Sequence, residues 1–354
     1  MDPYERVMCA IRHQQPDRPP IDYAATPEFN DALKKFLGVN DDAVLLQQLG
    51  VDIRRVKARF VGPSDMTAAR GRLAVGKDFF GIVREPVQHA YGFYNEIVFH
   101  PLARATTVKE VEEYPWPEVD WFDFSDMSED IARINGAQRY AIMYDRGGGA
   151  FEHPWYLRGL ERFLMDLVEC PDIAEAISYH VVKFFKELDM RAVEESNGQI
   201  DIISSGGDIG TQRGMMLSPE LWRRHIKPYS RELIRPFKDI GIATYYHSCG
   251  SILPVIEDFI EMGLDILDPI QPKAVGMEPE GLKERFGDRL TFHGGIDEQD
   301  LLPSGTPEEV RREAGRIIRI LGREGGYIVC PAHAIQPDTP VENIVALYET
   351  AREF

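Results

Sequence analysis

Cysteine is scarce in this 354-residue chain, and long hydrophobic runs are missing. The only four cysteines are Cys9, Cys170, Cys249 and Cys330, and their wide spacing argues against a disulfide framework. No run approaches the roughly 20 apolar residues that span a bilayer. The first residues also lack the charged-then-apolar layout of a secretory signal. We therefore expect a cytoplasmic protein without a membrane partner.

Basic residues are outnumbered in this chain. The 40 Lys and Arg residues stand against 58 Asp and Glu residues, which gives a net charge of -18. Because affinity for phosphate backbones needs clustered Lys and Arg, this balance argues against nucleic acid as a partner. The apolar content of 44% and charged content of 28% are those of an ordinary globular protein. The length suits two average domains or one large barrel.

Short apolar runs alternate with helical stretches along most of the chain. Strands are predicted near residues 21–23, 52–57, 140–144, 200–204, 242–246, 264–267, 290–292 and 327–330. Helices are predicted near 4–13, 27–37, 41–49, 155–168, 172–194, 218–238, 251–262, 306–322 and 340–353. Eight buried strands separated by helices predict an α/β fold, a (β/α)8 TIM barrel in a single domain covering residues 1–354.

Residues 60–135 do not follow this alternation of strands and helices. Two strand-like runs, 79–86 and 97–100, look like an antiparallel pair around Gly92, and an aromatic, acidic connection at 114–124 follows. We expect an inserted β-hairpin that acts as a lid or as a contact in a homodimer. The alternative is a hairpin packed on the main body without either role.

Polar residues follow six consecutive apolar runs. In a TIM barrel the C-terminal ends of the strands carry the active site, so these residues are expected to converge. They are Asp145, Asp208, His247, Cys249, Asp268, Gln271, His293, Cys330, His333 and Gln336. The glycine-rich run 146–150 lacks the Lys-Ser/Thr ending of a P-loop and is interpreted as a βα loop that lets backbone approach a substrate.

One pair of motifs has the composition of a zinc site. His247-x-Cys249 and the distant Cys330 offer one imidazole and two thiolates. Three such ligands suit zinc and leave its fourth position open for chemistry. That position could hold water, Asp268 or another carboxylate. The alternative interpretation is a hydrogen-bonded histidine beside buried, structural thiols.

Several longer motifs resemble the uroporphyrinogen decarboxylase-like proteins. They are Glu5-Arg6-Val7-Met8 with Pro16-Asp17-Arg18, Gly207-Asp208-Ile209-Gly210, Ser218-Pro219-Glu220, His247-Ser248-Cys249-Gly250, Gly294-Gly295-Ile296-Asp297 and the stretch from Pro331 to Ile344. The resemblance implies a TIM barrel. It also implies one of two activities: decarboxylation, or corrinoid-linked methyl transfer at zinc. Decarboxylases carry an N-terminal Arg-Gln-Ala-Gly-Arg type motif, where this chain has residues 23–26, Tyr-Ala-Ala-Thr.

The methyltransferase branch matches the zinc set, because His247, Cys249 and Cys330 occupy the ligand positions of its motifs. The resemblance then implies methyl transfer between a small O-methyl donor and a cobalt corrinoid (cobalamin) on a partner protein. No Asp-x-His-x-x-Gly cobalamin motif occurs in the chain. The expected catalytic residues are His333 and Asp208. Substrate binding is expected from Tyr144, Asp145, Gln212, Gln271, His293 and Gln336. The alternatives are a methylcorrinoid:thiol methyltransferase, a decarboxylase, and a non-catalytic, metal-stabilised binding subunit.

Overall fold

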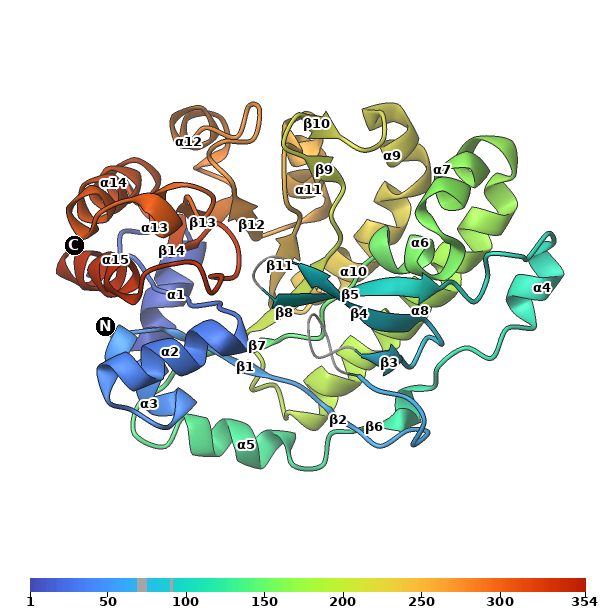
Figure 1. Cartoon of the computed structure of the whole chain (residues 1–354), viewed down its shortest axis with the longest axis horizontal. Helices are drawn as coiled ribbons and strands as arrows, with labels where there is room; N and C mark the ends of the chain where they lie inside the picture. Colours follow the sequence, from blue (N-terminus) through green and yellow to red (C-terminus); the bar gives the residue numbers. More distant parts are fainter. Residues whose placement is uncertain (69–74, 90–91) are drawn as a thin grey trace.

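Seven parallel strands form the central sheet of the computed structural model, in the order β1-β7-β8-β11-β12-β13-β14 (Figure 1). Their bounds are β1 Ile53–Val56, β7 Ala141–Tyr144, β8 Ile202–Gly206, β11 Ala243–His247, β12 Ile266–Ile270, β13 Thr291–Ile296 and β14 Tyr327–Pro331. The structure describes residues 1–68, 75–89 and 92–354. Each of these strands begins within two residues of its predicted start, and β12 and β13 extend three and four residues beyond their predicted ends.

The first predicted strand closes the sheet between β14 and β1. Ile21 forms a parallel bridge with Val329. The backbone N–H of Asp22 donates to Val329 O over 2.9 Å, and Asp52 N–H donates to Ile21 O over 2.8 Å. These bonds connect both edges of the seven-stranded sheet through one extended segment. The predicted barrel of eight strands is thereby confirmed, although this segment is too short to form a full strand.

Helices cover the outside of the sheet (Figure 1). The larger ones are α2 Pro27–Leu37, α3 Asp42–Leu49, α5 Met127–Ile134, α6 Glu152–Arg158, α7 Leu160–Glu169, α8 Pro171–Glu195, α9 Pro219–His225, α10 Lys227–Asp239, α11 Ile256–Met262, α12 Pro279–Phe286, α14 Pro307–Leu321 and α15 Val341–Glu353. The expected caps are present, since Ser218 accepts from Leu221 N–H and Thr306 forms a capping box with Glu309. The predicted helix 155–168 is two helices, because Gly159, with φ 88°, separates α6 from α7.

The hydrophobic core has two parts, because successive side chains along each strand point to opposite faces of the sheet. An inner cluster contains Ile53, Met143 and Ile202, and helix α1 (Pro3–Ile11) closes it from below with Val7 and Ile11. A larger outer cluster fills the space between sheet and helices. Side chains on one strand therefore point alternately into the barrel and toward the helices.

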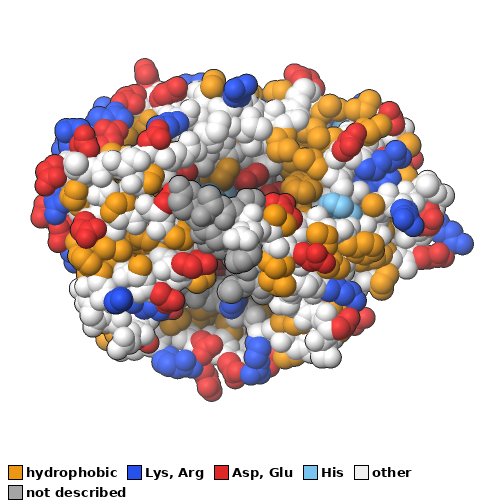
Figure 2. Space-filling model, in the orientation of Figure 1, with side chains coloured by type: hydrophobic (Ala, Val, Ile, Leu, Met, Phe, Trp, Pro, Cys, Tyr) orange, Lys and Arg blue, Asp and Glu red, His pale blue; other side chains and the backbone are white. Residues whose placement is uncertain are grey.

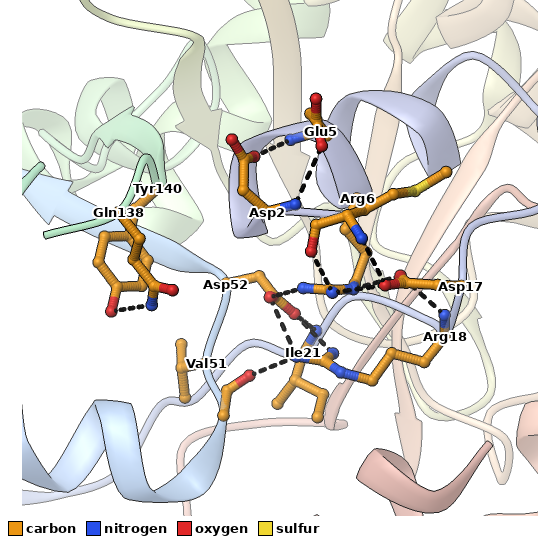
Figure 3. Close-up of polar contacts among 12 residues, drawn as sticks. Asp2, Glu5, Arg6, Asp17, Arg18, Ile21, Val51, Asp52, Gln138 and Tyr140 are labelled. Carbon is orange, nitrogen blue, oxygen red and sulfur yellow. Dashed lines mark hydrogen bonds and ion pairs between the residues drawn. The ribbon is translucent and has the colours of Figure 1, made fainter.

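A buried ionic network fastens α1 to the N-terminal end of the barrel (Figure 3). Asp52, 1% exposed, accepts from Arg6 Nη1 over 2.7 Å and from Arg18 Nη1 over 2.8 Å. It also accepts from the backbone N–H of Ile21 over 2.8 Å. Asp17 holds the other side of Arg6, with 2.7 Å between Arg6 Nε and Asp17 Oδ1. The motif that opens the chain therefore has a structural role at the end of the barrel away from the strands' C-terminal ends.

The inserted region contains the predicted hairpin. Strands β4 (Val83–His89) and β5 (Gly92–Phe99) pair antiparallel, and β3 (Gly76–Lys77) extends them. Gly92, expected between the two strands, is the first residue of β5, and residues 90–91 lie outside the described part of the chain. The base of the hairpin packs on α8, where the Phe80 ring lies 5.4 Å from the rings of Phe184 and Phe185.

Shorter elements complete the region and its surroundings: β2 Arg59–Phe60, β6 Phe122–Asp123, α4 Val108–Glu112, η2 Val119–Trp121, β9 Gly210–Thr211, β10 Gly214–Met215, η3 Leu253–Val255 and α13 Leu301–Ser304. The hairpin exposes apolar side chains at Val87, Val98 and Phe99. Acidic, basic and apolar side chains are interspersed on the face shown in Figure 2. The role of the hairpin as a lid or a homodimer contact stays a prediction. Within the described ranges, no helix has both the length and the apolar character needed to cross a bilayer.

Candidate metal centre

A cavity of about 280 Å³ lies at the C-terminal ends of the strands. Strands β1, β7, β8, β11, β12 and β13, together with the segment from Cys330 to Ala334, contribute its lining. The cavity is lined by Ala24, Arg55, Met143, Asp145, Gly147, Gly148, Glu152, Ser204, Ser205, Gly206, Gly207, Tyr245, His247, Asp268, His293, Cys330, Pro331, His333 and Ala334. Six of the residues singled out from the sequence therefore meet here: Asp145, His247, Asp268, His293, Cys330 and His333.

His247, the last residue of β11, is fixed by a carboxylate. Its Nδ1 lies 2.5 Å from Asp268 Oδ2. Asp268 comes from the neighbouring strand β12, which pairs with β11 in parallel at these two residues. Because this carboxylate engages Nδ1, the ring presents Nε2 on its other side, 3.7 Å from Cys249 Sγ. A carboxylate behind a histidine is the arrangement that orients metal-binding imidazoles.

The Cys249 side chain sits in a hydrogen-bonded loop. Gln271 Nε2 donates to Cys249 Sγ over 3.6 Å. The amide of Gln271 is itself held, because its Oε1 accepts from Gln212 Nε2 and from Gly250 N–H, each over 2.8 Å. Burial raises the pKa of Cys249, and the neighbouring His247 opposes that rise. Gln212 and Gln271, expected to bind substrate, lie behind the thiol in this structure and do not line the cavity.

Cys330 belongs to a second group on the same cavity. Its thiol is 1% exposed, and its Sγ lies within 4.8 Å of ligand atoms of Asp22 and His293. Among the described residues, the groups able to hold a metal are this one and the group Asp208, His247 and Cys249. The structure thus brings His247 and Cys249 together and places Cys330 in the adjacent group.

Asp268 connects the two groups. Its Oδ2 faces His247, and its Oδ1 lies 2.5 Å from His293 Nδ1. The other ring nitrogen of His293 lies 3.0 Å from Asp22 Oδ2. Burial alone would lower the pKa of His293, but Cys330, Asp268 and Asp22 raise it well above its ordinary value. With a carboxylate at each nitrogen, His293 holds both protons and acts as a buried cation.

Arg55 is the last member of this chain of charges. It was not among the site residues predicted from the sequence. Its Nη1 and Nη2 donate to the two oxygens of Asp22 over 2.8 and 2.5 Å. This fork-like pairing fixes Asp22, whose side chain is fully buried. Charged residues inside apolar strand runs, Asp22 in the first and Arg55 in the second, were the available signal.

Glu152 is a second residue that the sequence did not reveal. It begins α6, lines the cavity and accepts hydrogen bonds from Tyr156 and from the backbone N–H of Asp208. Burial, reinforced by the nearby Asp208 carboxylate, raises the pKa of Glu152 to about 7. Its place directly after the glycine-rich run was the only signal. Glu152 therefore brings a carboxyl group that can hold a proton near neutral pH.

The glycine-rich loop lies against the end of β8. Gly206 N–H donates to Gly148 O over 3.1 Å. A Cβ atom on Gly149 would lie 1.6 Å from Gly206 O, so only glycine fits there. The close backbone approach brings Glu152 to the cavity wall.

The remaining predicted residues differ in position. Tyr144 is 1% exposed and packs in the outer core. It follows Met143, which lines the cavity, and neighbouring side chains on a strand point to opposite faces. Gln336 Nε2 donates to Ala334 O over 2.8 Å, and Gln336 is not part of the cavity lining. The geometry thus gives no support to substrate binding by either residue. His333 lines the cavity, with its ring 6.3 Å from that of His247.

The comparisons with known proteins agree with this architecture. The family model for uroporphyrinogen decarboxylase (URO-D) matches residues 147–354, more than half of the chain. The chain belongs to the URO-D family. Similar sequences include uroporphyrinogen decarboxylases of Thermus thermophilus, 29% identical over 145 residues, and Coxiella burnetii, 35% identical over 147 residues. These matches cover 39% and 40% of this chain and 38% of each relative, so the chain spans about two fifths of the length of the relatives it matches.

A solved structure similar to this URO-D family member is a methyltransferase from Methanosarcina mazei. The TM-score is 0.71 at 18% sequence identity, and the superposition covers 100% of this chain and 99% of the other. At this identity the likeness shows the fold. The predicted superfamily and its TIM barrel are confirmed, and the similar proteins are named for enzymes of two kinds, decarboxylases and a methyltransferase.

Proposed function

We propose that this protein is a zinc-dependent methyltransferase. It moves a methyl group between a small O-methyl donor, such as a methyl ether or methanol, and a cobalt corrinoid carried by a partner protein. The observation that carries the proposal is the spacing of His247 Nε2 and Cys249 Sγ, 3.7 Å apart. Two ligands of tetrahedral zinc, with bonds of about 2.0 and 2.3 Å, stand about 3.5 Å apart.

The surroundings of this pair fit a bound zinc ion. Asp268 orients the imidazole through Nδ1 and leaves Nε2 for the metal. Gln271 donates to the Cys249 sulfur, which suits a thiolate better than a thiol. Cys330 lines the same cavity and would supply the third ligand. Its thiol lies with Asp22 and His293 in this structure, so it would have to rotate toward His247 to reach the metal. Soft thiolate ligands favour zinc over magnesium or calcium.

Bound zinc supplies Lewis acidity toward the oxygen of the methyl donor. The protein's own residues then orient that donor and manage its proton. His333 and Glu152 line the cavity, so either can deliver a proton to the oxygen that leaves as the methyl group departs. The cavity lies at the strand ends, where a partner-held corrinoid can approach.

The lining argues against uroporphyrinogen as the substrate. Binding a molecule with many carboxylates needs several cationic groups. Among the described lining residues, Arg55 is the only Lys or Arg, and Asp22 engages its guanidinium in a two-bond ion pair. Three acidic side chains, Asp145, Glu152 and Asp268, line the same cavity. This balance favours a neutral donor over a polycarboxylate.

Metal analysis combined with a methyl-transfer assay tests the proposal. The purified protein should contain one zinc per chain and should methylate cob(I)alamin in the presence of a methyl ether or methanol. Cys330→Ala should lose both properties. Cys170→Ala, at the boundary of α7 and α8, is the control and should retain both. Full activity of Cys330→Ala, or a wild-type protein without zinc, would refute the proposed function.

A further inference from the structure

Gln271 contacts the sulfur of Cys249 from the side away from the cavity. It follows β12 directly and is 5% exposed. Its Nε2 donates to Cys249 Sγ over 3.6 Å and to Ala332 O over 3.4 Å, so each of its two N–H groups has an acceptor. Its Oε1 accepts from Gly250 N–H and from Gln212 Nε2. The amide therefore connects residues that follow four strands, β9, β11, β12 and β14, around one sulfur atom.

Backbone groups fix the orientation of this amide. Gly250 N–H can only donate, so it requires the oxygen of Gln271. Ala332 O can only accept, so it requires the nitrogen. A reversed amide would place two acceptors together at Ala332 and two donors together at Gly250. An N–H group, and not an oxygen, therefore faces the sulfur of Cys249.

Cys249 is the more accessible of the two proposed thiolate ligands. It is partly exposed, whereas Cys330 is buried. A thiolate is a nucleophile as well as a metal ligand, so at a site that handles activated methyl groups it is itself a methyl acceptor. In that side reaction a lone pair of the Cys249 sulfur forms the S–CH3 bond. The carbon–cobalt bond of a methylcorrinoid breaks with its electron pair left on cobalt, which changes from cobalt(III) to cobalt(I), and no proton moves. The product is a neutral thioether, which lacks the charge of the thiolate ligand.

We propose that Gln271 is a positioning residue that protects Cys249 from methylation. Its N–H engages a lone pair of the sulfur and holds the sulfur beside His247 Nε2, 3.7 Å away. A hydrogen bond to an ionised acceptor stabilises the charged form, so the sulfur has to give up this bond before it attacks a methyl group. The inference rests on the proposed function, because a methyl-transfer site is where such protection is needed.

Iodomethane tests the protection directly on the purified full-length protein. The sulfur displaces iodide from this reagent, so the reaction needs neither a corrinoid nor the natural methyl donor. Peptide mass spectrometry follows the added CH2 group on Cys249. Since a hydrogen bond to a charged group is lost, Gln271→Met should react about 10–100-fold faster than wild type. Gln199→Met is the matched control, because the Gln199 amide donates to Ser128 Oγ and Ser196 O just before β8, and it should react like wild type.

Two charged variants separate protection of the sulfur from a purely structural role. Gln271→Glu keeps an oxygen that accepts from Gly250 N–H and removes the donor to the sulfur. Gln271→Lys keeps a donor and removes that oxygen. Protection predicts fast methylation in Gln271→Glu and slow methylation in Gln271→Lys, whereas a role limited to holding the loop predicts the reverse order. A reaction pH of about 8 keeps the new glutamate ionised.

The inference is wrong if Gln271→Met and Gln271→Glu both react at the wild-type rate, or if Gln271→Lys reacts as fast as Gln271→Glu. A second series replaces iodomethane by methylcob(III)alamin and should give the same order of rates. If the iodomethane result holds but no donor methylates cob(I)alamin, the protection of Cys249 stands and the proposed function fails. If wild type transfers methyl groups and Cys249 of Gln271→Met stays unmodified during turnover, only the present inference fails.

Discussion

Replacing Asp52 by asparagine should destabilise the barrel without affecting its proposed metal site. Asp52 is 1% exposed and neutralises two largely buried guanidinium groups, those of Arg6 and Arg18. Its Oδ2 also accepts from the backbone N–H of Ile21, in the segment that closes the barrel. Asparagine would leave both cations without their shared negative charge, and its amide N–H groups would face their donors.

The size of the effect follows from this burial. Breaking a buried ion pair by removing one partner costs about 3–5 kcal/mol. Unfolding entropy is about 2.1 cal/mol/K per residue, which for 354 residues gives about 0.7 kcal/mol/K. The variant should therefore melt about 4–7 °C below wild type. The same loss should move the first urea transition to lower concentration.

Asp17→Asn is the matched control. Asp17 also binds Arg6, but its side chain is 42% exposed, so its removal should cost only about 0–1 kcal/mol. Thermal melts of both variants and a zinc competition titration make the comparison. The reasoning fails if Asp52→Asn costs no more than Asp17→Asn, or if it weakens zinc binding at a temperature where it remains folded.

Three other substitutions test separate parts of the structure. Asp268→Asn should weaken zinc binding about 10–100-fold, measured by competition with a chromophoric chelator, since it loosens the histidine that the carboxylate orients. Burial raises the pKa of Asp201 to about 6, so its contribution to stability is complete below about pH 4 and is lost as pH rises through 6. Urea melts between pH 4 and 7 should show wild type losing up to about 3 kcal/mol relative to Asp201→Asn; parallel curves would contradict this. Gly149→Ala should cost about 1–3 kcal/mol or prevent folding, because its Cβ would collide with Gly206 O, whereas Gly281→Ala, with nothing within 4 Å, should be neutral or stabilising.

The barrel could be predicted because its strands are short, continuous apolar runs with clear helix signals between them. Elements without a long periodic pattern were not predicted, such as α12 and the 3-10 turn before α11. The predicted helix 218–238 is divided at Ile226 into α9 and α10, although the hydrophobic pattern runs across the division. Local pattern alone does not report such breaks, because tertiary packing decides them.

At the site, the sequence placed His247, Cys249 and the other rim residues in the correct part of the fold. It missed Asp22, whose partner His293 is 271 residues away in the chain. Only closure of the barrel brings the two together. Tyr144 was expected in the cavity because it ends a strand, and that strand end was predicted correctly. The face of the strand was not, because neighbouring residues point to opposite faces and a shift of one residue reverses them.

The first strand shows how the two ends of the barrel are kept independent. It joins the sheet through the bridge of Ile21 and a few backbone hydrogen bonds, and side chains hold it at both ends as well. At the lower end Asp52 holds the Ile21 N–H. At the upper end Arg55 and His293 hold the Asp22 carboxylate, and Tyr348 donates to Asp22 O over 2.9 Å. Because the upper contacts do not pass through Asp52, loss of the lower network should lower stability and leave the proposed metal centre in place.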